Sequence, residues 1–329
     1  MRRWQALAVG IMVLAALLGG GMVWVYRDFT GPGPLAESRT LIVPHGAGIR
    51  QIAQQLVEAG AIRSKLTFML GTELEGAGKP LKAGEYAFTA LMSGREILHA
   101  LQAGRIVIHH LTLAEGLTTH QILAQVAQAD ALVGDLPDPP PPEGSLLPET
   151  YNYIWGDARA DLVERMRKAM DTELAQIWAG RDQSVPLADA QQALILASIV
   201  ERETALESER RRVAAVFLNR LKHGMRLQAD PTAAYAVTHG AAPLARSLTR
   251  ADLETTDPFN TYTHDGLPPG PIANPGKATL EAVVHPAKSE DLYFVADGSG
   301  GHVFARTLEE HNRNVARWRQ VQRRPGETR

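Results

Sequence analysis

The chain opens with an uncharged apolar run and continues with shorter apolar segments of helical or strand period. The run extends from Trp4 to Tyr26, and about 20 apolar residues suffice to cross the hydrocarbon core of a bilayer. Because Arg2 and Arg3 precede it and aromatic residues stand at both of its ends, it predicts a transmembrane helix with a cytoplasmic N-terminus. The alternative is a cleaved signal peptide, for which the run is long and the glycines at 19–21 form only a weak cleavage site.

A pattern of short strand, glycine turn and amphipathic helix occurs twice within residues 39–130. The first copy turns at Gly46 and the second at Gly116. Between the copies, residues 84–90 alternate as in a strand, and Ser93 is placed to cap a following helix. These features predict a small α+β module that resembles lysin-motif domains, whose general role is to hold N-acetylated glycan chains. A spacer or docking domain without glycan contact is the alternative.

A proline-rich stretch follows this module at residues 135–144. Proline removes a backbone donor and fixes φ, so neither a helix nor a central strand fits there. The stretch predicts a domain boundary, with a loop inside one domain as the alternative. The predicted organisation is, in chain order, a cytoplasmic tail (1–3), a transmembrane helix (4–26), a linker (27–38), the lysin-motif-like module (39–130), a proline-rich linker (131–144) and a second domain (145–329).

The second domain is predicted to be mainly helical at first and rich in loops and short strands afterwards. Apolar positions at helical spacing define the helices, and alternation with turn residues defines the strands. The predicted elements are helices over about 158–179, 187–204 and 208–223, the last ended by Gly224, then strands near 292–296 and 302–305 and a helix around Trp318. The fold class is therefore α+β.

The composition excludes several kinds of chemistry. The chain has 329 residues, a net charge of −2, 45% apolar residues and no cysteine. The near-neutral balance lacks the electrostatic footprint of a nucleic-acid-binding protein, and the absence of cysteine excludes disulfides, zinc–thiolate sites, iron–sulfur clusters and a cysteine nucleophile. The 11 histidines lack metal-ligand spacing, so a metal-dependent hydrolase is disfavoured and neither a metal nor a cofactor is expected. Lone histidines such as His302 and His311 are expected to be surface or hydrogen-bonded residues.

Two carboxylates at the end of the second of these helices are candidates for acid–base chemistry. Residues 194–200 are apolar almost all round, which predicts a buried helix. Helical geometry places Glu203 on the apolar stripe that continues to Leu206, whereas Glu201 points about 160° away. Because burial disfavours an ionised carboxylate, the pKa of Glu203 should rise and make it a general acid near pH 7. The alternative is a partly exposed Glu203 paired with Arg210.

The loops beyond this helix concentrate groups that proteins use to hold sugars. Gln228 and Asp230 lie on one loop, Asn260 and Tyr262 on another, and a proline-rich loop follows at 266–272. Amides and hydroxyls can bond to sugar oxygens, aromatic rings can cover apolar sugar faces, and prolines lower the ordering entropy. Loops without a ligand are the alternative. Asp230, a nearby second acid, is interpreted as a turn residue before a proline.

Several longer motifs lie in the second domain. They are Ala197-Ser-Ile-Val-Glu-Arg-Glu-Thr-Ala205, Val216-Phe-Leu-Asn-Arg-Leu221, Gly224-Met-Arg-Leu-Gln-Ala-Asp-Pro-Thr232, Asn260 with Tyr262, Gly266-Leu-Pro-Pro-Gly270, His285-Pro-Ala-Lys288 and Leu292-Tyr-Phe-Val-Ala-Asp-Gly298. These motifs resemble the endolytic murein transglycosylase family, a YceG-like family. They keep the family's order over about residues 145–315, and the anchor and the module match its layout. The resemblance implies cleavage of the β-1,4 bond between N-acetylmuramic acid and N-acetylglucosamine within peptidoglycan strands. The implied product is a 1,6-anhydro-muramyl end, formed in wall remodelling and strand termination.

The resemblance also implies roles for individual residues and partners. In lytic transglycosylases a small hydroxylated residue follows the catalytic glutamate, so Glu203 is expected to be catalytic. The expected substrate-binding residues are Thr204, Gln228, Asp230, Asn260 and Tyr262. One carboxylate suffices because the substrate's own C6 hydroxyl is the attacking group. Expected partners are peptidoglycan glycan strands and synthases of the elongation machinery, and the expected location is the inner membrane, single-pass, with a periplasmic catalytic domain. A non-catalytic membrane-anchored peptidoglycan-binding protein is the alternative.

Overall fold

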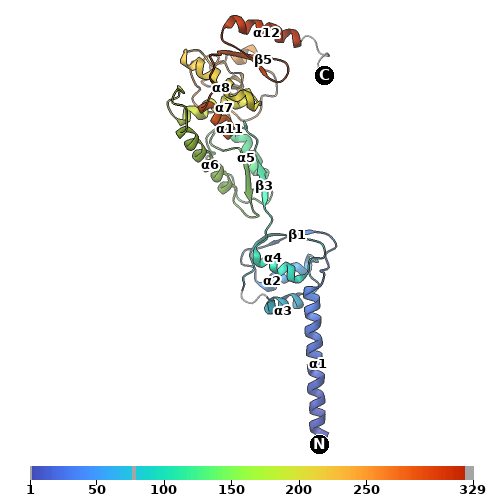
Figure 1. The fold of residues 1–329 in the computed structure, drawn as a ribbon. Coiled ribbons are helices and arrows are strands. Elements are labelled where there is room, and N and C mark those ends of the chain that lie inside the picture. Colours follow the sequence, from blue (N-terminus) through green and yellow to red (C-terminus); the bar gives the residue numbers. More distant parts are fainter. Residues whose placement is uncertain (1, 76–78, 323–329) are drawn as a thin grey trace. The chain divides into compact units, whose positions relative to one another are not determined.

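The computed structural model describes residues 2–75 and 79–322, which form two compact units (Figure 1). Unit 1 comprises residues 1–109 and 152–157, and unit 2 comprises residues 110–151 and 158–329. Helices dominate both units, and the strands of the described ranges form three sheets of two strands each. The mixed helix and sheet class predicted from the sequence is thus confirmed, while the likeness of the N-terminal module to a lysin motif stays a prediction.

Unit 1 begins with the long apolar helix α1 (Arg2–Thr30). Its segment from Trp4 to Thr30 is long and apolar enough to cross a membrane, and most of its side chains are exposed. The last turn differs, because Phe29 is only 3% exposed and packs in the core of unit 1. A Cβ atom on Gly71 would lie 2.4 Å from the Phe29 ring, so only glycine permits this approach. The helix therefore extends into the segment predicted as a linker, since its last turn has a core to bury.

The rest of unit 1 packs helices around one antiparallel strand pair. Strand β1 (Arg39–Val43) pairs with β2 (Gly84–Phe88), and the helices are α2 (Ile49–Glu58), α3 (Lys65–Glu75) and α4 (Gly94–Ala103). Ser93 caps α4 in a reciprocal capping box with Glu96, as its position predicted. Helix α3 was not predicted, because its apolar residues do not keep to one face.

The predicted repeat is visible in the backbone, although its copies lie in different units. Gly46 and Gly116 both adopt positive φ, at 77° and 78°, and each precedes a helix. The first copy is β1 and α2, and the second is β3 (His109–Thr112) and α5 (Thr119–Gln128), with α5 in unit 2. The compact units thus divide the chain at residue 109, whereas the predicted module ended at residue 130.

Unit 2 is built around α7 (Ala190–Glu203), whose residues 193–200 are all buried. Asp189 caps its N-terminus through the backbone N–H of Gln192, at 2.8 Å. Helices α8 and α11 pack on α7 and on each other, and their apolar side chains form the largest core (Figure 1). Strand β4 (Thr150–Tyr153) pairs with β3, and its last two residues belong to unit 1. The other elements of unit 2 are α6 (Arg159–Ala179), α8 (Glu207–Lys222), α9 (Asp230–Thr238), α10 (Arg250–Leu253), α11 (Lys277–Val284), β5 (Tyr293–Ala296, antiparallel to β6), β6 (His302–Ala305) and α12 (Leu308–Gln322).

Helices α6, α7 and α8 lie within about three residues of their predicted bounds, and Gly224 lies two residues beyond the end of α8 with φ of 62°. The region beyond Gly224 was expected to be loop-rich, but it also contains α9, α10 and α11. The proline-rich stretch 135–144 belongs to unit 2, where Glu143 accepts hydrogen bonds from the Thr119 backbone N–H (2.7 Å) and the Asn274 side chain (3.1 Å).

Candidate active site

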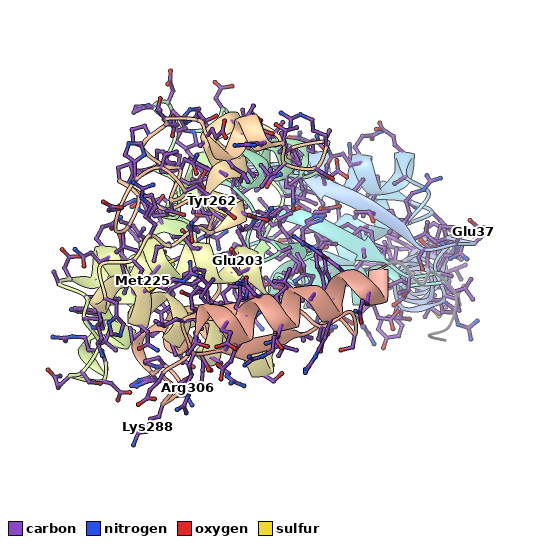
Figure 2. All side chains as sticks on the ribbon, turned by 90° about the horizontal axis from the view of Figure 1, so that it is seen from above. Glu37, Glu203, Met225, Tyr262, Lys288 and Arg306 are labelled. Atoms are coloured by element: carbon purple, nitrogen blue, oxygen red, sulfur yellow. The ribbon has the colours of Figure 1, made fainter. Side chains whose placement is uncertain are left out.

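A cavity of about 280 Å³ lies at the C-terminal end of α7. Four of the predicted site residues line it, namely Glu203, Gln228, Asp230 and Tyr262. Figure 2 labels Glu203 and Tyr262 near each other in unit 2. The remaining lining residues are Phe217, Arg220, Leu227, Phe294 and His311. Residues from four helices, from strand β5 (Tyr293–Ala296) and from loops thus meet at one carboxylate.

Glu203 is the last residue of α7, and burial raises its pKa from 4.5 to about 8. The negative charge of Asp230 raises this pKa further, and the positive charge of Arg220 opposes the shift. Within the described part of the chain, no group donates a hydrogen bond to the Glu203 carboxyl. The glutamate is therefore protonated near pH 7 and faces a cavity, which is the state a general acid needs.

The route by which Glu203 becomes desolvated differs from the predicted one. Thr204 is extended (φ −140°, ψ 131°), so α7 ends at Glu203, and Leu206 is 40% exposed. The predicted stripe from Glu203 to Leu206 is therefore wrong. Apolar side chains also line the cavity that Glu203 faces, namely Phe217 from α8 and Phe294 from β5.

Glu201 occupies a different environment from Glu203, although the two glutamates are two residues apart. One oxygen of its buried carboxylate accepts the Gly276 backbone N–H at 2.9 Å, and the other lies 3.5 Å from the Arg210 guanidinium. Arg210 also pairs with Glu115 at 3.0 Å. The alternative pairing of Glu203 with Arg210 is therefore wrong, because Arg210 pairs with Glu201 and Glu115.

Asp230 begins α9, so it starts a helix and is not a simple turn residue. Its negative charge is favourable at a helix N-terminus. The Tyr262 hydroxyl donates to its carboxylate at 2.5 Å, and burial and this bond raise the pKa of Tyr262. Tyr262 therefore holds its proton and holds Asp230 beside Glu203.

Gln228 reaches the cavity from a backbone that few side chains tolerate, with φ of 49°. Its N–H donates to the Thr261 carbonyl at 3.2 Å, which ties this loop to the loop that carries Tyr262. Arg220 stabilises the same region, because its Nε donates to the Leu292 carbonyl at 2.7 Å and its Nη1 to the Leu227 carbonyl at 2.8 Å.

Asn260 and Thr204 lie outside the cavity lining, although both are site residues in the sequence prediction. Asn260 is 0% exposed and donates to the Thr255 carbonyl at 2.8 Å, while its Oδ1 accepts the Tyr262 N–H at 3.1 Å. Thr204 is buried and its hydroxyl accepts the Leu206 N–H at 3.1 Å. Both side chains therefore fix the backbone next to a cavity residue.

His311 is a cavity residue that sequence reasoning missed. It comes from α12, its ring stacks on Tyr293 (centroids 5.2 Å apart), and its Nδ1 is buried with no partner among the described residues. Burial and the charge of Arg220 lower the pKa of His311, so the ring is neutral near pH 7. No spacing or motif connects His311 to Glu203. Within the described ranges no cluster of three potential metal ligands occurs.

These features define an α+β protein with one long apolar N-terminal helix and a cavity around a protonated glutamate. The chain belongs to the YceG-like family, whose family model matches residues 41–317. A crystal structure of a YceG-like protein from Listeria monocytogenes is similar, with a TM-score of 0.54 and 30% identity, over 84% of this chain and 98% of that one.

Two curated relatives carry the name endolytic murein transglycosylase. The protein of Bacillus subtilis (strain 168) is 38% identical over 174 residues, which are 53% of this chain and 47% of that one. The protein of Streptococcus pneumoniae serotype 2 is 28% identical over 365 residues, which are 95% of this chain and 65% of that one. The chain therefore spans about half to two thirds of the length of these relatives.

Proposed function

We propose that this protein is an endolytic peptidoglycan lytic transglycosylase that leaves 1,6-anhydro-N-acetylmuramic acid ends. The observation that carries the proposal is Glu203, a carboxyl with a pKa of about 8 in an accessible cavity. Membership of the YceG-like family and the names of the curated relatives support it. The expected biological role is wall remodelling, including the termination of glycan strands.

A single carboxyl can carry out both proton transfers of this reaction. Glu203 donates its proton to the glycosidic oxygen as the bond from that oxygen to C1 of the muramic acid breaks. The C6 hydroxyl of the same sugar then forms the new bond to C1, and the Glu203 carboxylate accepts its proton. The reaction consumes no water. Because the attacking hydroxyl belongs to the sugar whose bond breaks, the attack is intramolecular and has a high effective molarity. This mechanism needs no second catalytic acid, in contrast to hydrolytic glycosidases.

The charge of Asp230 gives the cavity a second role in this mechanism. The transition state carries positive charge at C1, and a carboxylate near it stabilises that charge. Tyr262 positions Asp230, and Gln228 offers an amide to a sugar oxygen. Thr204 and Asn260, predicted as substrate-binding, are proposed to position this machinery through the backbone.

We further propose that α1 anchors the protein in the inner membrane, with residues 1–3 in the cytoplasm and the catalytic domain in the periplasm. Its length and hydropathy support this, and Arg2 and Arg3 favour the orientation. A protease added to spheroplasts should degrade unit 2. Protection of unit 2 would contradict the orientation, and loss of α1 from the mature chain would support a signal peptide. The proposed partners are glycan strands and the synthases of the elongation machinery.

Mass spectrometry of muropeptides tests the proposed activity. Purified sacculi incubated with the protein should release anhydro-muropeptides, and Glu203→Gln should release none above background. A wall-binding protein without activity, the second candidate function, would bind sacculi and release nothing in either form. Products with reducing ends would instead show a hydrolase and exclude the transglycosylase.

A further inference from the structure

A stripe of exposed leucines runs along α3 in unit 1. Leu66, Leu70 and Leu74 follow one another at intervals of four residues, so they lie on one side of the helix. Their exposed fractions are 62%, 42% and 60%. The buried face of α3, with Thr67, Phe68 and Gly71, is separate from this stripe. A protein surrounded only by water rarely maintains such a contiguous apolar surface without a function.

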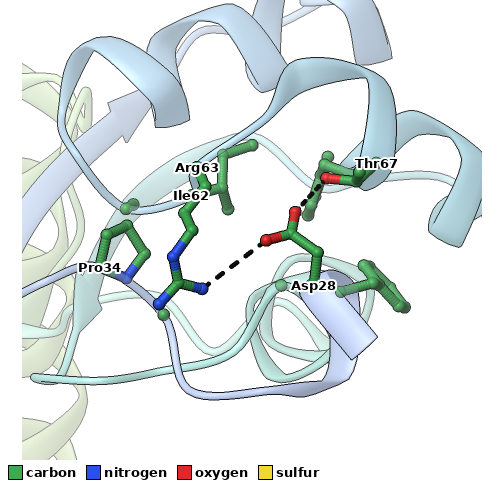
Figure 3. Close-up of a pocket in the computed structure, with 10 residues that line it drawn as sticks. Asp28, Pro34, Ile62, Arg63 and Thr67 are labelled. Atoms are coloured by element: carbon green, nitrogen blue, oxygen red, sulfur yellow. Dashed lines mark hydrogen bonds and ion pairs between the residues drawn. The ribbon is translucent and has the colours of Figure 1, made fainter. Parts of the chain in front are cut away.

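The first turns of α3 are fastened to the end of the apolar helix α1. The Thr67 hydroxyl donates to the Asp28 carboxylate at 2.5 Å, and Arg63 lies 3.7 Å from the same carboxylate (Figure 3). Phe68 packs edge-on against Phe29, with ring centroids 6.2 Å apart. The N-terminal half of α3 is thus held beside the last turn of α1.

The last turn of α3 is fastened to α1 as well, through a residue of α4. Arg95 donates from Nε to the Glu75 carboxylate at 2.8 Å and from Nη2 to the Tyr26 hydroxyl at 3.1 Å. Its guanidinium also lies 5.3 Å from the centroid of the Tyr26 ring. Since both ends of α3 are held beside residues 26–29, α3 cannot move far along the axis of α1.

Residues 26–29 are also where α1 leaves the bilayer, if the run from Trp4 to Tyr26 spans it. At about 1.5 Å per residue this run is about 35 Å long, against a hydrocarbon core of about 30 Å. Tyr26 then lies at the interface, where aromatic residues are enriched. Figure 1 shows α3 on the side of unit 1 from which α1 emerges, and its axis crosses the direction of α1.

We propose that α3 lies in the membrane interface, with Leu66, Leu70 and Leu74 inserted at the boundary between headgroups and acyl chains. The proposal rests on the proposed anchoring by α1. Lipid is the expected occupant because the contacts at both ends of α3 hold the exposed leucines beside residues 26–29, where α1 would emerge from the bilayer. Unit 1 is then fixed to the bilayer at two places, which limits its rotation about α1.

The absence of cysteine from the sequence makes a direct test possible, because each single-cysteine variant carries one label. Leu70→Cys is the test variant and Ile42→Cys the matched control. Ile42 is also apolar and 39% exposed, and it lies on β1, away from α3 in Figure 1. Each full-length variant is spin-labelled and reconstituted in phosphatidylethanolamine–phosphatidylglycerol vesicles, and label depth is measured from accessibility to oxygen and to a water-soluble nickel chelate.

The label at Leu70 should lie about 5–10 Å below the phosphates, and the label at Ile42 should be in water. Equal access of the nickel chelate to both labels overturns the proposal. Spin–spin broadening at Leu70 also overturns it, since a second copy then covers the stripe. A label at Leu17→Cys tests the anchor separately, because Leu17 lies in the middle of α1 and must be buried in lipid whenever α1 spans the membrane. A buried label at Leu17 with a water-exposed label at Leu70 contradicts only the placement of α3, whereas water-exposed labels at both positions contradict the anchor.

Discussion

Replacing Glu203 by glutamine should inactivate the protein and stabilise it at the same time. Glutamine keeps the shape of the side chain and a hydrogen-bonding group, but it has no proton to transfer. Because Glu203 is proposed to act both as acid and as base, the loss of rate should exceed the roughly 10²–10⁴-fold that general acid–base assistance supplies.

The gain in stability follows from the pKa of Glu203. A carboxyl with a pKa of about 8 in the folded state and about 4.5 in the unfolded state takes up a proton on folding at any pH between these values, so the folded state binds more protons there. The free energy of unfolding of the wild type therefore falls as pH rises from about 4.5 to 8. At about 1.36 kcal/mol per pH unit, the cost at pH 7 is about 3 kcal/mol. Glutamine does not titrate and avoids this cost.

The assay is the melting temperature of both proteins from pH 4 to pH 9. For a domain of about 150–250 residues, 3 kcal/mol corresponds to a rise of about 6–12 °C in Glu203→Gln at pH 7. The difference should vanish near pH 4, where the carboxyl is protonated in both states. Glu207→Gln is the matched control, since Glu207 is exposed in the first turn of α8 and outside the cavity lining. It should keep the activity and the pH dependence of the wild type.

Two results would refute this reasoning. A difference in melting temperature that does not change with pH would show that Glu203 is not desolvated in the folded protein. Release of anhydro-muropeptides by Glu203→Gln at a rate near that of the wild type would exclude Glu203 as the proton donor, whatever the stability.

Three further substitutions test the groups around Glu203. Tyr262→Phe removes the hydroxyl that donates a hydrogen bond to Asp230. A hydrogen bond to a charged group contributes about 1.5–3 kcal/mol, so the rate of muropeptide release should fall about 10–100-fold with no change in product. Asn260→Ala leaves the Thr255 carbonyl without its side-chain donor in a fully buried place and should lower the free energy of unfolding by about 1–3 kcal/mol in a urea titration. His311→Phe keeps a ring against Tyr293 but has no nitrogen, so KM should rise while the melting temperature stays the same; an unchanged KM would show that His311 does not contact substrate.

The sequence predicted the elements that carry a strong apolar period. Helices α6, α7 and α8 each bury a continuous set of apolar side chains, so pattern alone located them. Helices α9 and α11 are 9 and 8 residues long, and α9 begins with Asp230-Pro231, which is also typical of a turn. Short helices of this kind form because the core of unit 2 holds them, and no local pattern records that.

The candidate site was predictable only where its residues lie in recognisable motifs. Glu203, Gln228, Asp230 and Tyr262 belong to the family motifs and meet in one cavity. His311 reaches the same cavity from α12, and only the packing of β5 and α12 brings it there. The buried positions of Asn260 and Thr204 also depend on tertiary structure. The sequence pattern around a polar loop residue is the same whether its side chain faces a ligand or the core.

The end of α7 explains how two glutamates separated by one residue acquire opposite properties. Glu201 is surrounded by donors, the Gly276 N–H and the Arg210 guanidinium, which hold its carboxylate in place. Glu203 has no such donor among the described residues, and apolar rings together with the charge of Asp230 favour its protonated form. The helix stops at Glu203 because Thr204 is extended, and this places the carboxyl at the cavity and not against the next turn. The same helix end therefore supplies both a fixed structural carboxylate and a carboxylic acid able to transfer its proton.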